Sequence, residues 1–127
     1  MTNFEKTILF TDTDGRARFR CETVALTEGK PQAQLSPLMQ GGGYQLRHSP
    51  VGFRSQFHCS DHPQWVFILS GFMEIGLQDG SSRVFGPGEH FYSEDLLPQG
   101  ASFDPQVHGH WSRQVGQHPL VTLFVRG

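Results

Sequence analysis

Apolar and polar residues alternate over short stretches of this chain, and no stretch carries a sustained helical period. Within residues 16–26, for example, alternation places Ala17, Phe19, Cys21 and Thr23 on one face. Such stretches, rich in Val, Ile, Phe and Thr, are typical of half-buried strands. We therefore predict strands at residues 7–11, 16–26, 44–49, 52–58, 65–71, 73–78, 83–85, 89–93, 107–112 and 120–125.

Turn-forming residues separate these stretches. The chain contains 15 Gly and 8 Pro residues, spread along its length, and Asp79-Gly80 is a pair that tolerates the positive φ of a hairpin turn. Residues 96–106 form the one connection long enough to act as a lid. Many short strands joined by tight turns predict an all-β fold.

Length and charge limit the possible functions. A chain of 127 residues suffices for one domain with a single core. The 10 Lys and Arg residues against 12 Asp and Glu give a net charge of -2 without a basic run, which is unlike a nucleic-acid-binding protein. The start of the chain lacks the layout of a signal peptide, and no apolar run approaches the ~20 residues that cross a bilayer. We expect a cytoplasmic protein with no nucleic-acid or membrane partner, in which Cys21 and Cys59 are free thiols.

Two histidine clusters are the strongest chemical signal. His58 and His62 lie just before an apolar strand, and His108 and His110 lie near the end of the chain. Imidazole is a preferred ligand of Fe, Zn, Ni and Cu, and an open catalytic site needs about three protein ligands. If the strands enclose a cavity, alternation puts His62 in phase with Gln64. His110 is in phase with His108, which we expect to be an exposed strand-edge residue.

The strand predicted at residues 52–58 would extend this polar lining. If His58 faces the interior, Gln56 and Arg54 share its face. The guanidinium of Arg54 is suited either to binding a substrate carboxylate through two hydrogen bonds or to pairing with a buried acid.

The first of these clusters resembles a motif of the cupin superfamily. That motif has two histidines separated by one residue, a glutamate three or four residues on, and an apolar run ending in glycine. Aligned on Gly71, this chain has His58 at the first histidine position, Ser60 at the second and Gln64 at the glutamate position.

The second cupin motif has a Pro-Gly turn and a third histidine, followed four residues later by asparagine. Pro87-Gly88 matches the turn, His110 matches the histidine, and Gln114 stands where the asparagine would be. The resemblance covers roughly residues 45–125 and is to small single-domain bacterial cupins.

The resemblance implies one domain over residues 1–127, built as a double-stranded β-helix, or jelly-roll barrel. The barrel would span about residues 45–125, and residues 1–44 would add strands to a sheet edge. A homodimer is the default expectation, because open edges invite pairing. The resemblance also implies one divalent transition metal, Fe, Zn, Ni or Mn. The predicted metal ligands are His58, His62, Gln64 and His110, and the predicted substrate-binding residues are Arg54, Gln56 and Gln64.

In the metal site, His62 would replace Ser60 as the third histidine, and the amide of Gln64 would bind weakly or orient a water. The leading hypothesis is a metal-dependent enzyme, with oxygenase chemistry as its main case, acting on a small polar or acidic organic metabolite. The alternative is a metal-free small-molecule-binding module whose histidines are hydrogen-bond anchors. A third is an interaction domain with a closed interior, since one fold hosts many functions.

Overall fold

The structure of residues 2–127 is a computed structural model, and the described chain contains strands and connecting segments but no helix. Consequently, no helix in this part of the chain is long and apolar enough to cross a membrane. The strands are β1 (Asn3–Thr11), β2 (Ala17–Ala25), β3 (Glu28–Lys30), β4 (Ala33–Leu35), β5 (Tyr44–Ser49), β6 (Gln64–Ser70), β7 (Phe72–Gly76), β8 (Ser82–Phe85), β9 (His90–Glu94), β10 (Trp111–Val115) and β11 (Leu120–Arg126).

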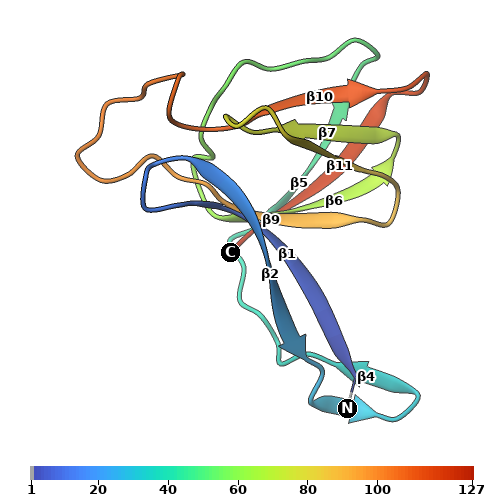
Figure 1. Cartoon of the computed structure of the whole chain (residues 1–127). Helices are drawn as coiled ribbons and strands as arrows, with labels where there is room; N and C mark the ends of the chain where they lie inside the picture. Colours follow the sequence, from blue (N-terminus) through green and yellow to red (C-terminus); the bar gives the residue numbers. More distant parts are fainter. Residues whose placement is uncertain (1) are drawn as a thin grey trace.

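Two sheets form the body of the molecule, one across from the other (Figure 1). The larger has six strands in the order β2-β1-β9-β6-β11-β5, and the smaller has three in the order β10-β7-β8. The pairing of β1 with β9 is parallel, and the other pairs of these two sheets are antiparallel. The all-β prediction is therefore confirmed.

The apolar core lies between the two sheets. Ile68 on β6 and Leu120 on β11 are contributed by the larger sheet, and Ile75 on β7 and Phe85 on β8 by the smaller. Each of these side chains is at most 1% exposed. Burial of one such side chain stabilises the fold by roughly 1.5–3 kcal/mol, so this cluster fixes the sheets face to face.

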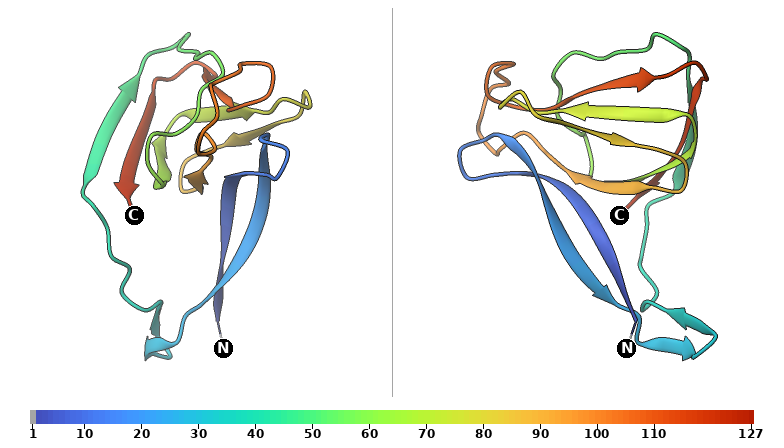
Figure 2. Two further views of the ribbon diagram at one scale, coloured as in Figure 1. Left: turned by 90° about the vertical axis from the view of Figure 1, so that its left-hand side faces the viewer. Right: turned by 45° about the vertical axis from the view of Figure 1, so that its right-hand side comes forward.

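The N-terminal strands form a long hairpin that extends beyond the two sheets, with β3 and β4 near its far end (Figure 2). The hairpin joins the larger sheet through residues 8–10 of β1, which pair with β9. In the order of that sheet β2 is the edge strand and β1 lies inside it. The N-terminal strands therefore complete a sheet of their own chain.

Two predicted strands are wrong. Residues 52–58 make only isolated bridges, at Arg54 and His58, because Pro50 lacks an amide proton and Gly52 adopts a φ of +94° that turns the chain. The second, at residues 107–112, is wrong in its first part: the carbonyl oxygen of Asp104 accepts from the amides of Val107 and His108 in a turn, and β10 begins only at Trp111. The short strands β3 and β4 were not predicted, since their residues are all exposed and show no apolar alternation. The remaining strands are found within a few residues of the predicted positions.

Candidate functional site

A cavity of about 320 Å³ lies between the sheets, beside the apolar core. Its apolar walls come from both sheets: Val66, Met73, Ile75, Phe91 and Phe124. The pairing of strands in the larger sheet explains why the cavity lining becomes polar beside these apolar walls. Gln64 on β6 is paired with Ser93 on β9 and with Arg126 on β11, and all three line the cavity.

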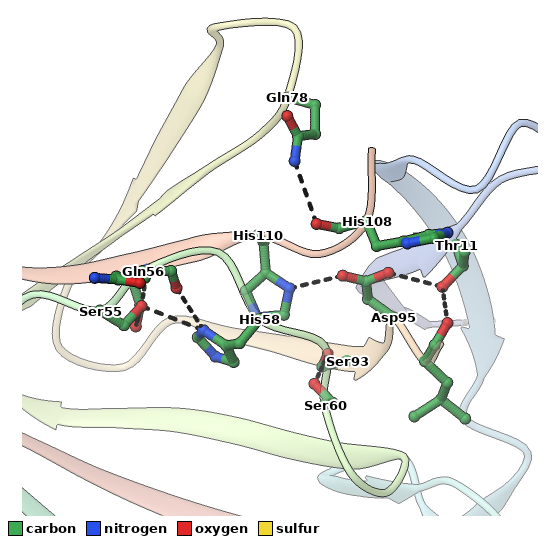
Figure 3. Close-up of polar contacts among 12 residues, drawn as sticks. Thr11, Ser55, Gln56, His58, Ser60, Gln78, Ser93, Asp95, His108 and His110 are labelled. Carbon is green, nitrogen blue, oxygen red and sulfur yellow. Dashed lines mark hydrogen bonds and ion pairs between the residues drawn. The ribbon is translucent and has the colours of Figure 1, made fainter. Parts of the chain in front are cut away.

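His58 and His110 meet at one side of this cavity. Their backbones form an antiparallel bridge, with N···O distances of 2.9 and 3.0 Å, and their ring centroids are 4.7 Å apart (Figure 3). Gly109 permits this approach, because a Cβ on that residue would lie 2.5 Å from the carbonyl oxygen of His58. The structure therefore brings together the two histidines that the cupin motifs single out.

A buried carboxylate fixes the ring of His110. Its Nδ1 donates to Oδ2 of Asp95 over 2.8 Å, and Asp95 itself is 0% exposed. The hydroxyl of Thr11, on β1, donates to the other carboxylate oxygen over 2.7 Å. A proton on Nδ1 leaves Nε2 of a neutral His110 with a free lone pair, available as a base, a hydrogen-bond acceptor or a ligand.

The ring of His58 is oriented by the backbone. Its Nδ1 donates to the carbonyl oxygen of Gln56 over 2.9 Å, so its Nε2 also carries the lone pair when the ring is neutral. Partial burial lowers the pKa of His58 from its ordinary value of 6.5. The hydrogen bond to Gln56 acts in the opposite direction, and the proximity of His110 acts in the same direction as burial. His58 is therefore a neutral imidazole at neutral pH.

The remaining predicted metal ligands, His62 and Gln64, also line the cavity. Within residues 2–127, however, no three His, Cys, Asp or Glu side chains come close enough together to hold a metal ion. The described residues bring two histidine ligands together, whereas an open catalytic metal site uses three protein ligands. The metal site therefore stays a prediction.

The predicted substrate-binding residues Arg54 and Gln56 do not line this cavity. They border a separate surface hollow, together with Phe103 and Trp111. The prediction assumed the alternation of a strand, and residues 52–58 do not form one. Gln64 is the predicted substrate-binding residue that the structure places in the cavity.

Two further residues have structural roles. His108 is only 9% exposed, and its Nδ1 accepts a hydrogen bond from the amide of Asp104, so the expectation of an exposed strand edge was wrong. Gln114, at the asparagine position of the cupin motif, accepts from the amide of Gly52 and donates to the carbonyl oxygens of Gly116 and His118. It connects loops and does not line the cavity.

Sequence reasoning missed Arg47, on β5, and the roles of Asp95 and Arg126. A signal for Arg47 was present: Gln45 and Arg47 share the inward face of β5, while Tyr44 and Leu46 point outward and are exposed. A strand with reversed polarity marks a polar interior. No local signal connects Asp95 with His110, because the two residues are on different segments that meet only in the fold.

Cys59 also borders the cavity. Partial burial, helped by the charge of Asp95, raises the pKa of its thiol to about 11, so the thiolate form is scarce at neutral pH. Both cysteines are unpaired in the described chain, as expected from the sequence. Cys59 is therefore not an activated nucleophile in this geometry.

Neither a comparison with protein-family models nor a search of curated proteins finds a match to this chain.

Proposed function

We propose that this protein binds a small molecule in the cavity between its sheets. The cavity itself carries the proposal: about 320 Å³ of space lined by apolar walls and by convergent polar groups, among them His58, His110 and Gln64. Ligand sites are typically concave, roughly 300–1,000 Å³ in volume, and mostly apolar with a few oriented polar groups. This is the metal-free alternative of the sequence hypotheses, and it needs no catalytic step.

The two histidines support binding because both rings are held in a fixed orientation. His110 is anchored by the buried carboxylate of Asp95, and His58 by the backbone of Gln56. Their Nε2 atoms are the acceptors that remain for a donor group of the ligand. These acceptors beside apolar walls can bind a hydrogen-bond donor on a ligand whose body is apolar.

A matched pair of substitutions tests the proposal. A fragment library is screened by NMR for chemical-shift changes at the imidazoles of His58 and His110. Gln64→Trp fills the cavity, and we expect it to abolish fragment binding, whereas Gln56→Trp, at the outer hollow, leaves binding unchanged. A screen without any cavity ligand, or fragments that bind Gln64→Trp as well as wild type, would refute the proposal.

A metal-dependent protein is the second candidate, and one observation favours it. A histidine that donates its other nitrogen to a carboxylate or a carbonyl is the usual arrangement of a metal ligand, and His110 and His58 both have it. His62 and Gln64 would have to complete the donor set. A bound metal ion would supply Lewis acidity, and with neutral ligands it would keep its full positive charge.

Titration with Zn²⁺ and Fe²⁺, followed by elemental analysis, tests this candidate. If it holds, wild type takes up about one ion per chain, His110→Ala loses that ion, and the exposed-histidine control His118→Ala keeps it. Gln64→Glu should then retain metal more tightly, since a carboxylate replaces an amide. Absence of stoichiometric uptake in wild type would leave the metal-free function as the only one supported.

The finer architectural and cellular assignments are also proposals. Two facing sheets around a polar cavity support a cupin-like jelly roll, and the unpaired thiols of Cys21 and Cys59 support a reducing, cytoplasmic compartment. A homodimer would cover an open edge strand such as β5.

A further inference from the structure

Arg47 is the one cationic side chain that β5 directs toward the cavity. Its guanidinium lies over two aromatic rings, with the central carbon 5.2 Å from the centroid of Phe53 and 4.8 Å from that of Phe124. Such contacts favour a cation over the ring faces and restrict its motion. The group is therefore held in place without any anionic neighbour.

No ion pair within residues 2–127 includes Arg47, and its Nε and Nη2 atoms are buried without a hydrogen-bond partner. By contrast, the two arginines of β2 have carboxylate partners: Arg18 pairs with Asp14, and Arg20 with Glu94. Burial lowers the pKa of Arg47, but a guanidinium stays charged at any physiological pH. Arg47 as a whole is half-buried, but buried polar atoms normally have partners, and a partly buried cation without one destabilises a fold.

The charged side chains that line the cavity near Arg47 are mainly positive, and a neighbouring hydroxyl group has no hydrogen-bond partner. Arg126, on β11, also lines the cavity and takes part in no ion pair of the described chain, while Asp61 is the carboxylate on the lining. Thr122, which faces Arg47 in the β5–β11 register, is 0% exposed, and its hydroxyl has no partner either. Two neighbouring inward positions of one sheet thus hold polar groups that nothing in the chain satisfies.

We propose that Arg47 is the anion anchor of the cavity, and that the ligand is a small organic oxyanion, a carboxylate or a phosphate monoester with an apolar body. This inference rests on the proposed binding function and names its ligand class. The charge of a guanidinium is delocalised over three nitrogens, so an oxyanion that meets Arg47 from the cavity side neutralises the whole group. The walls formed by Val66, Ile75 and Phe91 would contact the apolar body.

The test compares anions with neutral analogues of the same shape. Benzoate is titrated beside benzamide, succinate beside succinamide, and phenyl phosphate beside inorganic phosphate, by calorimetry or NMR. We expect an organic anion to bind at least about tenfold more tightly than its amide, because hydrogen bonds to charged groups are the stronger ones. Phenyl phosphate against benzoate decides which head group is preferred, and inorganic phosphate should bind weakly, since it has no apolar body.

The variant is Arg47→Met, which keeps much of the length and removes the charge, and the control is Arg54→Met, outside the cavity. Arg47→Met should lose the preference for the anion while its melting temperature stays equal to wild type or rises, because an unpartnered cation is removed. Arg54→Met should keep the preference. An anion preference that survives in Arg47→Met overturns the inference, as does a cavity that binds only neutral ligands.

These outcomes separate the two proposals. If neutral fragments occupy the cavity and anions do not, the binding function stands and the anion anchor fails. If no fragment or anion produces shifts at His58 or His110, both fail.

Discussion

The space between the two sheets has two ends with opposite chemistry. At one end, Leu9, Ile68, Phe85 and Leu120 fill the space and are at most 1% exposed. At the other end, Arg47 and Gln64 of the larger sheet and the bridged pair of His58 and His110 line a cavity. The change occurs along single strands: β6 runs from Gln64 through Val66 to Ile68. The apolar end holds the sheets together, which allows the polar end to remain incompletely filled.

The largest effect should come from breaking the apolar end. Ile68→Ala removes a side chain that is 1% exposed and does not line the cavity, and we expect the free energy of unfolding to fall by about 2–5 kcal/mol. Denaturant unfolding measures this change. Leu69→Ala, at a position 49% exposed, is the control and should stay within about 0.5 kcal/mol of wild type. Equal losses in the two variants would contradict the division proposed for the two ends.

A smaller effect should follow from separating the histidine pair. Gly109→Ala puts a Cβ at a φ of +84° and 2.5 Å from the carbonyl oxygen of His58, so we expect a loss of about 1–3 kcal/mol in stability. The NMR signals of both imidazoles should move as the bridge opens. Gly116→Ala, also at positive φ but in open space, provides the control, since it shares the backbone strain without the contact. If both variants leave the imidazole signals unchanged, Gly109 does not position the pair.

The smallest effect should be a pH dependence of stability. Burial lowers the pKa of His58, and burial together with the nearby charges of Arg83 and Lys6 lowers that of His90, both from an ordinary value of 6.5. The unfolded chain then takes up protons more readily than the folded one just below this pH. Stability is therefore fully present above about pH 6.5 and is lost as the pH falls toward the folded-state pKa values.

Melting curves from pH 7.5 to 5 in metal-free buffer measure this slope. His58→Asn should remove the part of the pH dependence that arises at the polar end. His90→Asn should remove the part that arises on the outer face of the larger sheet, where Nε2 of His90 accepts a hydrogen bond from the amide of Thr7. The exposed His118 supplies the control, and His118→Asn should melt with the wild-type slope. A slope that neither His58→Asn nor His90→Asn changes would have to arise from other groups.

Sequence patterns anticipated the apolar end better than the polar end. Alternation puts Val66 and Ile68 of β6 on one face, because a strand repeats every two residues, and the structure buries both in the core. The aromatic residues Trp65, Phe67 and Phe72 were also expected in the core, but they lie outside it, and Phe72 is 46% exposed. Alternation also places Gln64 correctly on the cavity side. The same rule failed for Arg54 and Gln56, since it holds only inside a strand and Gly52 turns the chain there.

Most side-chain contacts across the fold could not be predicted. His110 contacts Asp95 through a side-chain hydrogen bond, and His58 contacts His110 through a backbone bridge, and these segments have no shared periodicity. The histidine motif placed His58 and His110 in one site, but it did not indicate that Asp95 and the backbone of Gln56 orient their rings. Arg47 was missed for a different reason: an arginine in a strand is usually exposed, so the reversed polarity of β5 was overlooked, and its contacts with Phe53 and Phe124 appear only in the fold.

The reversed polarity of β5 has a consequence for folding. Because strands repeat every two residues, a slip of one residue against β11 would turn Tyr44 and Leu46 inward and send Arg47 out to water. The slipped pairing would bury more apolar surface and would expose Arg47 to water, where its charge is solvated. Side-chain burial alone therefore favours the slipped register, which has no polar cavity. The correct alignment relies on the turn before the strand, where Gly43, at a φ of +102°, accepts a hydrogen bond from the amide of Arg126. In β5, the backbone turn at Gly43 therefore opposes the one-residue slip, which the hydrophobic pattern of this edge strand would favour.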